Sequence, residues 1–383
     1  MGVKVRMNGL KVLITNIRMS RRSGTEMYVH DLARALIRRG HSPVVYSPDQ
    51  GPLAKELAEN SVPIVARLDK IRETPDIIHG HHTLQTLAAM LHFPTTPGVF
   101  LCHDFEAWHD TPPKLPRIGR YVAVDQTCAE RLVLAEGVDR SQVNILTNPV
   151  DLQLFQSRPR LPEKPRKAII FSSYGNHESI QPIQHACDQL GIELDAVGER
   201  LGSVCHEPQK LLPEYDLVFA KGRCAREAMA VGCAVIYCDV FGMSYLVTSD
   251  NVAHMNQWGR RALSFTVTEE RLVQEIERYD AEDAAKVSSY IRTYNNTDVI
   301  YDQLLQIYEE VIQQHRTSDR NDYHEELRAV AKMTEWWNVM HHVAQTPPAN
   351  ATSPSIQNAK LWLASKFTWL QRKGNNSDIA KAA

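Results

Sequence analysis

The sequence lacks the features that mark membrane-spanning, secreted or disulfide-bonded chains. It contains no apolar run of about eighteen residues, so no segment is expected to cross a bilayer. No apolar stretch of signal-peptide length precedes the first predicted strand. The seven cysteines show no paired spacing, which favours reduced thiols. Together these absences predict a cytoplasmic protein, with peripheral contact at a membrane surface left open.

The sequence also lacks an excess of either sign of charge, with 43 Lys and Arg against 45 Asp and Glu, and this argues against another class of partner. The formal net charge of 383 residues is only −2, so a nucleic-acid partner is not expected. The chain has 43% hydrophobic and 23% charged residues, which is typical of a soluble globular protein. No internal repeat of solenoid period is visible. The length exceeds one ordinary core and predicts two domains with an extension.

Short apolar runs alternate with helical patterns along residues 1–156, which predicts an N-terminal Rossmann-like domain with a doubly wound parallel sheet. A helix is expected over Glu26–Arg39, where apolar residues recur at helical spacing. The predicted strands are Lys11–Thr15, Pro43–Tyr46, Asp76–His79, Val99–Cys102, Tyr121–Val124 and Val143–Leu146.

The alternation restarts after a proline-rich linker over residues 157–167. Residues 168–300 are predicted to form a second Rossmann-like domain, so that the two halves face a cleft where such folds bind ligands. Residues 301–345 are then expected to be helical, over Val299–His315 and Asp322–Gln345, and to cross back to the first domain. The second domain's predicted strands are Ala168–Ser172, Glu193–Val197, Asp216–Ala220 and Ala234–Cys238.

The segment Lys221–Asp239 has the pattern of a nucleotide-sugar site. A short cationic loop, Lys221–Cys224, is predicted to precede a helix that ends at Gly232. Glu227 near the start of this helix could accept hydrogen bonds from sugar hydroxyls. Lys221 and Arg223 are candidate phosphate ligands. The simpler alternative is that both cations are ordinary surface charges.

Two further turns could hold phosphate groups. Gly24 and Thr25 open the first predicted helix, whose N-terminal N–H groups favour an anion, and the preceding loop is cationic. Ser173 lies in a Ser/Gly-rich turn after the first strand of the second half, where backbone N–H groups can also meet phosphate. A solvated turn is the alternative in both places. The cations of the first loop are Arg18, Arg21 and Arg22.

His103 follows a buried strand and is the candidate catalytic residue, because its side chain is expected to face the cleft. The alternative is a strand-end histidine bonded to backbone groups. His82 and Asp104 are candidates on the acceptor side. The cluster His79, His81 and His82 invites a metal interpretation, but no CxxC or HExxH accompanies it. A loop that lines the cleft is favoured, and no metal is expected.

In combination these pieces resemble a GT-B fold glycosyltransferase of the large retaining family four, over roughly residues 10–315. The resemblance lies in SGTEMYVHDLARALIRRGHSPVVYSP, PDIIHGHH, FLCHD, VNILTNPVDLQLF and YDLVFAKGRCAREAMAVGCAVIYCD. It implies that Gly24 lies against the donor diphosphate, that His103 lies near the transferred sugar and that Glu227 holds the ribose. The implied reaction transfers a sugar from a nucleotide-diphosphate donor to a hydroxyl of a sugar, lipid-linked or small-molecule acceptor with retention, and requires no cofactor or metal.

Two departures from the family pattern stand out. The family usually carries a glutamate eight positions before the ribose-binding one, and Phe219 stands there. The usual Arg and Lys after the first strand of the second half are also absent. Lys221 and Arg223 are expected to supply the lost positive charge.

Residues 346–383 are predicted to be a linker followed by an amphipathic helix over 355–373. Its basic and tryptophan residues suit an anionic membrane surface or a partner's groove, and packing on the chain itself is the alternative. Other functions consistent with the sequence are a GT-B sugar-nucleotide epimerase and a non-catalytic protein that binds a nucleotide or glycan and scaffolds a partner.

Overall fold

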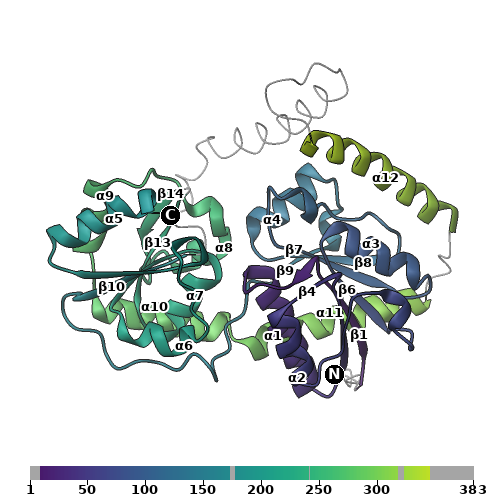
Figure 1. Cartoon of the computed structure of the whole chain (residues 1–383), viewed down its shortest axis with the longest axis horizontal. Helices are drawn as coiled ribbons and strands as arrows, with labels where there is room; N and C mark the ends of the chain where they lie inside the picture. The colour runs from purple at the N-terminus through teal and green to yellow at the C-terminus, as the bar shows by residue number, and fades with distance from the viewer. Residues whose placement is uncertain (1–8, 173–176, 241, 318–322, 346–383) are drawn as a thin grey trace.

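The computed structural model describes residues 9–172, 177–240, 242–317 and 323–345. Two α/β domains lie side by side, each with a central sheet covered by helices on both faces (Figure 1). This confirms the predicted fold class of two Rossmann-like halves.

The N-terminal sheet contains seven parallel strands in the order β5-β3-β1-β6-β7-β8-β9. Its central strands consist of apolar residues because both faces are covered; Val12, Leu13 and Ile14 are at most 1% exposed. A minor parallel pair, β2 with β4, lies outside it. The strands are β1 (Lys11–Thr15), β2 (Arg18–Met19), β3 (Ser42–Tyr46), β4 (Asp49–Gln50), β5 (Ile64–Val65), β6 (Ile77–His81), β7 (Gly98–Cys102), β8 (Ile118–Ala123) and β9 (Val143–Ile145).

The C-terminal sheet has five strands in the order β11-β10-β12-β13-β14. Its first four strands are parallel, as expected, whereas β14 is an antiparallel edge strand that the sequence analysis missed. Only two residues separate β13 from β14 in the sequence, and so short a connection can join antiparallel neighbours but not parallel ones. The strands are β10 (Lys167–Phe171), β11 (Glu193–Val197), β12 (Leu217–Ala220), β13 (Ala234–Asp239) and β14 (Gly242–Leu246).

The helices cover both sheets. Those of the first half are α1 (Gly24–Arg38), α2 (Pro52–Glu59), α3 (Thr83–His92) and α4 (Gln126–Glu130). Those of the second half are α5 (His177–Gln189), α6 (Pro208–Leu211), α7 (Gly222–Val231), α8 (Val252–Trp258), α9 (Glu269–Glu277) and α10 (Ala281–Tyr294).

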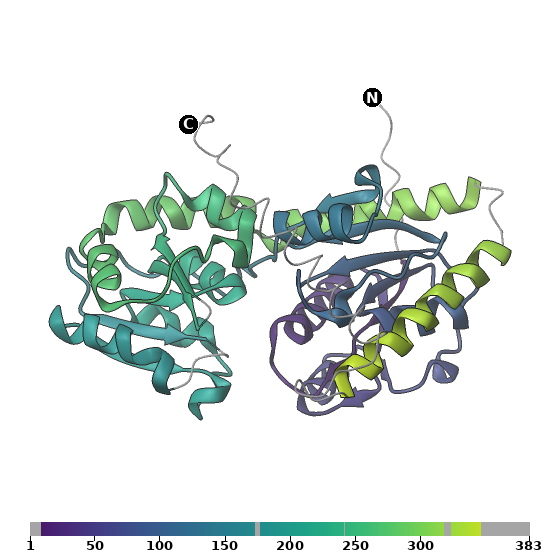
Figure 2. The ribbon, with the colours of Figure 1, turned by 90° about the horizontal axis from the view of Figure 1, so that it is seen from above.

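The last two described helices return to the N-terminal domain. Helix α11 (Thr297–Thr317) places Tyr301, Leu304 and Tyr308, each at most 1% exposed, in the core formed by the first sheet. Helix α12 (Tyr323–Gln345) lies along the outside of the same domain (Figure 2). Among the described residues, no helix combines the length and the apolar character that crossing a membrane would require.

Candidate functional site

The segment Lys221–Asp239 forms a strand–helix–strand unit without the predicted loop. Helix α7 begins at Gly222 and Lys221 is its N-cap, so the expected loop Lys221–Cys224 is wrong. Gly222 has φ of 58° and donates its N–H to the Tyr237 hydroxyl at 2.9 Å, a long-range contact that fixes the start of the helix. Gly232 ends the helix in the left-handed conformation, as predicted.

Glu227 lies in the second turn of α7 rather than at its start, and it is 4% exposed. Arg223, one turn earlier, donates from Nε to Glu227 Oε1 at 2.6 Å and from Nη2 to Asp31 Oδ2 at 2.5 Å. Burial raises the pKa of Glu227, and the Arg223 charge offsets part of this effect. Asp31 is on α1, so Arg223 joins the two domains beside Glu227.

Asp31 is a site residue that the sequence analysis missed. Burial alone would raise its pKa, but Arg223 and the hydrogen bond with His30 lower it to about 2. A carboxylate within a helical pattern carries no signal of an interdomain contact, because the partner is 192 positions away.

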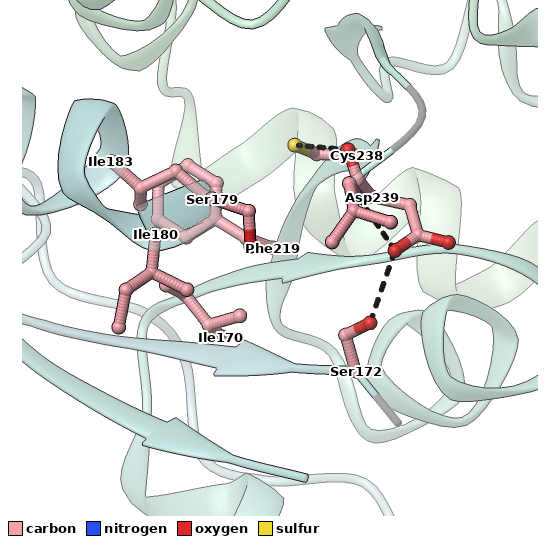
Figure 3. Close-up of a pocket in the computed structure, with 9 residues that line it drawn as sticks. Ile170, Ser172, Ser179, Ile180, Ile183, Phe219, Cys238 and Asp239 are labelled. Carbon is pink, nitrogen blue, oxygen red and sulfur yellow. Dashed lines mark hydrogen bonds between the residues drawn. The ribbon is translucent and has the colours of Figure 1, made fainter. Parts of the chain in front are cut away.

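Lys221 also forms an ion pair with a carboxylate. Its ammonium group forms an ion pair with Asp239, whose side chain is 0% exposed, at the end of β13. Asp239 Oδ1 accepts the Ser172 hydroxyl at 3.2 Å, and both residues line a small pocket between α5 and the ends of β10, β12 and β13 (Figure 3). The other walls of the pocket are mainly apolar, including Ile180 of α5 and Phe219 of β12.

Phe219 stands where the family usually carries a glutamate, eight positions before Glu227, and the structure shows that this position is inside a strand. Phe219 is a 1% exposed strand residue, and one residue separates the end of β12 at Ala220 from the start of α7. The loop that would carry that carboxylate is therefore absent, rather than merely altered in sequence.

Gly24 opens α1 and is exposed, and a Cβ atom built on it meets nothing within 4 Å. The backbone at this helix start thus has room for a ligand. Part of its positive potential is already balanced, because the buried carboxylate of Glu26 lies in the first turn and accepts the Thr25 hydroxyl at 3.0 Å. Thr25 could therefore reach an anion mainly through its backbone N–H.

The three arginines of the preceding loop all have carboxylate partners. Arg18 pairs with Glu26 at 3.3 Å, Arg22 with Glu56 at 2.8 Å, and Arg21 with Glu199 of the other domain at 3.5 Å. Arg21 and Glu199 are both more than half exposed, so this pair can open at little cost.

His103 follows β7 and contacts two aromatic side chains. Its Nε2 lies 2.7 Å from His81 Nδ1, and its ring makes an edge contact with Tyr28 of α1 at 5.1 Å between centroids. Burial lowers the pKa of His103 to about 4 and that of His81 well below the usual value, so both rings are neutral at pH 7.

Asp110 holds the backbone of the His103 loop and was also missed. Its Oδ2 accepts the backbone N–H groups of His103 at 2.9 Å and Asp104 at 2.7 Å, and its Oδ1 lies 3.1 Å from His82 Nδ1. Burial opposes ionisation, but the contacts with His82 lower the pKa of Asp110 to about 2. His82, proposed from the sequence as an acceptor-side residue, is 2% exposed with φ of 62°, and in this structure it supports the loop.

Asp104, the other acceptor-side candidate, forms a turn. Its Oδ1 accepts the N–H groups of Glu106 at 2.6 Å and Ala107 at 2.8 Å. Arg131 donates hydrogen bonds to the carbonyls of Asp104 and Ala107. The structure therefore gives Asp104 a positioning role.

Three side chains around this loop have metal-ligand types. Ligand atoms of His82, His109 and Asp110 all lie within 4.8 Å of one another, so the folded chain supplies the partners that the HGHH sequence alone did not. Both Asp110 oxygens already accept hydrogen bonds, and this accounts for the cluster without an ion.

Two of the sequence predictions concern residues that the structure does not describe. These are Ser173 and the amphipathic helix over 355–373.

Comparison with known proteins bears on the fold. Residues 22–154 match the model of Glycosyltransferase Family 4. HepE of Anabaena, in complex with UDP and glucose, is similar over 78% of this chain and 99% of its own, with 15% identity and a TM-score of 0.59. A glycosyltransferase from Rickettsia africae is similar over 80% of this chain and 99% of its own, with 14% identity and a TM-score of 0.59. No curated protein sequence matches the chain. At these identities the similarity establishes the GT-B fold.

Proposed function

We propose that this GT-B protein is a retaining glycosyltransferase that moves a sugar from a nucleoside-diphosphate sugar to an acceptor hydroxyl. The observation that carries the proposal is the buried Glu227, held by Arg223 on the face of α7 that meets α1. A buried carboxylate with one oxygen held by a guanidinium keeps its other lone pairs for sugar hydroxyls. Because HepE binds UDP and UDP-glucose, a uridine diphosphate sugar is the first donor to test.

The other side chains have complementary roles in this proposal. The α1 backbone at Gly24 receives a phosphate, and His103 contacts the transferred sugar. When the donor enters, Arg223 exchanges Asp31 for a phosphate oxygen and helps to stabilise the leaving diphosphate. No metal step is required by this arrangement.

Glu227→Gln is expected to weaken donor binding by about tenfold or more, because an amide accepts weaker hydrogen bonds than a carboxylate does. The measurement is isothermal titration with uridine, guanosine and adenosine diphosphate sugars. Glu270→Gln, an exposed change on α9, is the matched control. Equal affinities of Glu227→Gln and the unchanged protein would rule out the ribose role.

Gly24→Val distinguishes an effect on ligand binding from an effect on the stability of the fold. The new side chain meets no protein atom within 4 Å of its Cβ, so the melting temperature is expected to change little. Its two methyl groups would occupy the space above the helix start, and donor affinity is expected to fall by about tenfold or more. An unchanged affinity would place the diphosphate elsewhere.

A non-catalytic nucleotide-binding protein is the second candidate, favoured by one observation. The loop between β12 and α7, where the family's sugar-contacting glutamate would lie, is absent. Turnover decides between the two: donor-dependent transfer, or slow hydrolysis of the bound donor, supports the enzyme. Tight binding with neither reaction supports the non-catalytic protein.

A further inference from the structure

His81 is the last residue of β6, His103 directly follows the neighbouring strand β7, and the two rings contact each other edge to edge. In the β6–β7 register His81 is opposite Leu101, so His103 lies two residues beyond its partner position. The rings are nearly parallel, with centroids 4.9 Å apart and 20° between planes, and the contact is His81 Nδ1 to His103 Nε2 at 2.7 Å. At this distance one of the two nitrogens carries a proton and the other accepts it.

The surroundings of His81 decide which nitrogen is the donor. The side chain is 0% exposed, and its Nε2 has no hydrogen-bond partner within the described part of the chain. A proton on Nε2 would be a buried, unpaired N–H, which native structures avoid more strictly than an unpaired acceptor. A proton on Nδ1 is satisfied by His103. The neutral His81 therefore donates from Nδ1 to His103 Nε2.

This assignment fixes the tautomer of the second ring. A neutral imidazole that accepts at Nε2 carries its proton at Nδ1. Within the described part of the chain, Nδ1 of His103 has no hydrogen-bond partner, and His103 is only partly buried. We propose that His81 is a positioning residue that holds His103 as the Nδ1–H tautomer, so that His103 presents a hydrogen-bond donor to the ligand.

The ligand group that suits this donor is an oxygen acceptor, either a sugar hydroxyl or a phosphate oxygen of the donor substrate. Such a histidine cannot act as a general base through its accessible nitrogen, because that nitrogen already holds a proton. The identity of the ligand rests on the proposed glycosyltransferase function, whereas the tautomer does not.

Other contacts keep the two rings from rearranging. Thr15 Oγ1 hydrogen-bonds both the N–H and the carbonyl of His81 at 3.0 Å, which fixes that strand residue. Asp110 accepts the His103 N–H, and Tyr28 packs against the His103 ring. The histidine pair is thus held in place at the carboxyl ends of two inner strands, β6 and β7.

The direct test is ¹⁵N NMR of the full chain with labelled histidine at pH 7.5, assigned with His103→Gln and His81→Asn. We expect protonated nitrogen signals for Nδ1 of both rings and unprotonated signals for both Nε2 atoms. A protonated Nε2 on His103 would overturn the proposal. This result does not depend on whether any nucleotide-sugar binds.

Two variants test the consequence for binding. In His81→Asn the amide N–H₂ stands near the former Nδ1 and preserves the donor, so donor affinity is expected to stay within about threefold. In His81→Leu no donor faces His103 Nε2, so the ring is free to take the Nε2–H tautomer, and donor binding is expected to weaken about fivefold or more. His92→Asn, exposed at the end of α3, is the control.

Equal binding by His81→Asn and His81→Leu, with both folded, would refute the positioning role. If the unchanged protein binds none of the nucleotide-sugars, the proposed function fails, and the NMR result still decides the tautomer.

Discussion

Acidification from pH 6.5 to 4.5 is expected to destabilise the N-terminal domain by about 3 kcal/mol per pH unit over the steepest part of this range. The cause is a set of buried neutral histidines. His79 and His81 are 0% exposed; burial lowers the pKa of His79 to about 3 and that of His81 well below 6.5. Each adds a slope of up to about 1.4 kcal/mol per pH unit.

The sign follows from proton uptake. Between pH 6.5 and the lowered folded values, the unfolded histidines bind protons that the folded ones do not. The contribution of these neutral histidines to the free energy of unfolding is therefore fully present above about pH 6.5. It is lost as the pH falls toward the pKa values of the folded state. His103, with a folded pKa of about 4, adds a smaller share because it is partly exposed. Glu227 acts in the opposite direction, since its folded pKa is raised.

Urea unfolding at pH 7.0, 6.0, 5.5 and 5.0 measures the effect, with far-ultraviolet circular dichroism as the signal. His92→Gln removes an exposed histidine and is expected to leave the slope unchanged. His79→Gln is expected to reduce it by about one proton. A slope of less than one proton per molecule in the unchanged protein would mean that these histidines are charged in the folded state.

Removing the Arg117 guanidinium is expected to cost about 3–5 kcal/mol of unfolding free energy, the range for breaking a buried ion pair. Arg117 is 5% exposed and forms an ion pair with Glu326 of α12. It also donates to the carbonyls of Met90 at 2.6 Å, Phe93 at 3.1 Å and Thr96 at 2.5 Å, at the end of α3 and in the turn after it. Arg117→Met leaves a carboxylate and three carbonyls without this partner.

The same substitution is expected to loosen α12 before the rest of the domain unfolds. Urea unfolding gives the free energy, and limited proteolysis under native conditions reports cleavage within residues 323–345. Arg316→Met, an exposed change on α11, is the control and is expected to cost less than about 0.5 kcal/mol. Equal protease resistance of the two variants would show that α12 is held by its apolar contacts alone.

Local sequence was sufficient for most of the fold. Most strands were found because continuous apolar runs suit doubly covered parallel sheets, whereas the two-residue strands β2, β4 and β5 were missed. The end of α7 was found because glycine adopts a left-handed conformation at no steric cost, as Gly232 does. The start of α7 was misjudged because it depends on the Tyr237 hydroxyl, which only the folded sheet brings to Gly222. Edge strand β14 escaped because it has no repeating apolar pattern of its own.

The candidate site was less predictable because its contacts join distant positions. Lys221, Arg223 and Glu227 could be selected from charge and helix position, but their partners Asp31 and Asp239 could not. The histidines were visible as single residues. Their pairing depends on strand register, which local sequence does not determine.

The path of α11 has a consequence for biosynthesis. The N-terminal core is completed by Tyr301, Leu304 and Tyr308, which the ribosome adds only after the whole second domain. A nascent chain that has released residues 9–150 still exposes the apolar surface on β7 and β8 that α11 later covers. Domains usually fold in order from the N-terminus during synthesis. Here the first domain to emerge is the last to be finished, and it depends on chaperones, or on its own partial stability, throughout synthesis of the second.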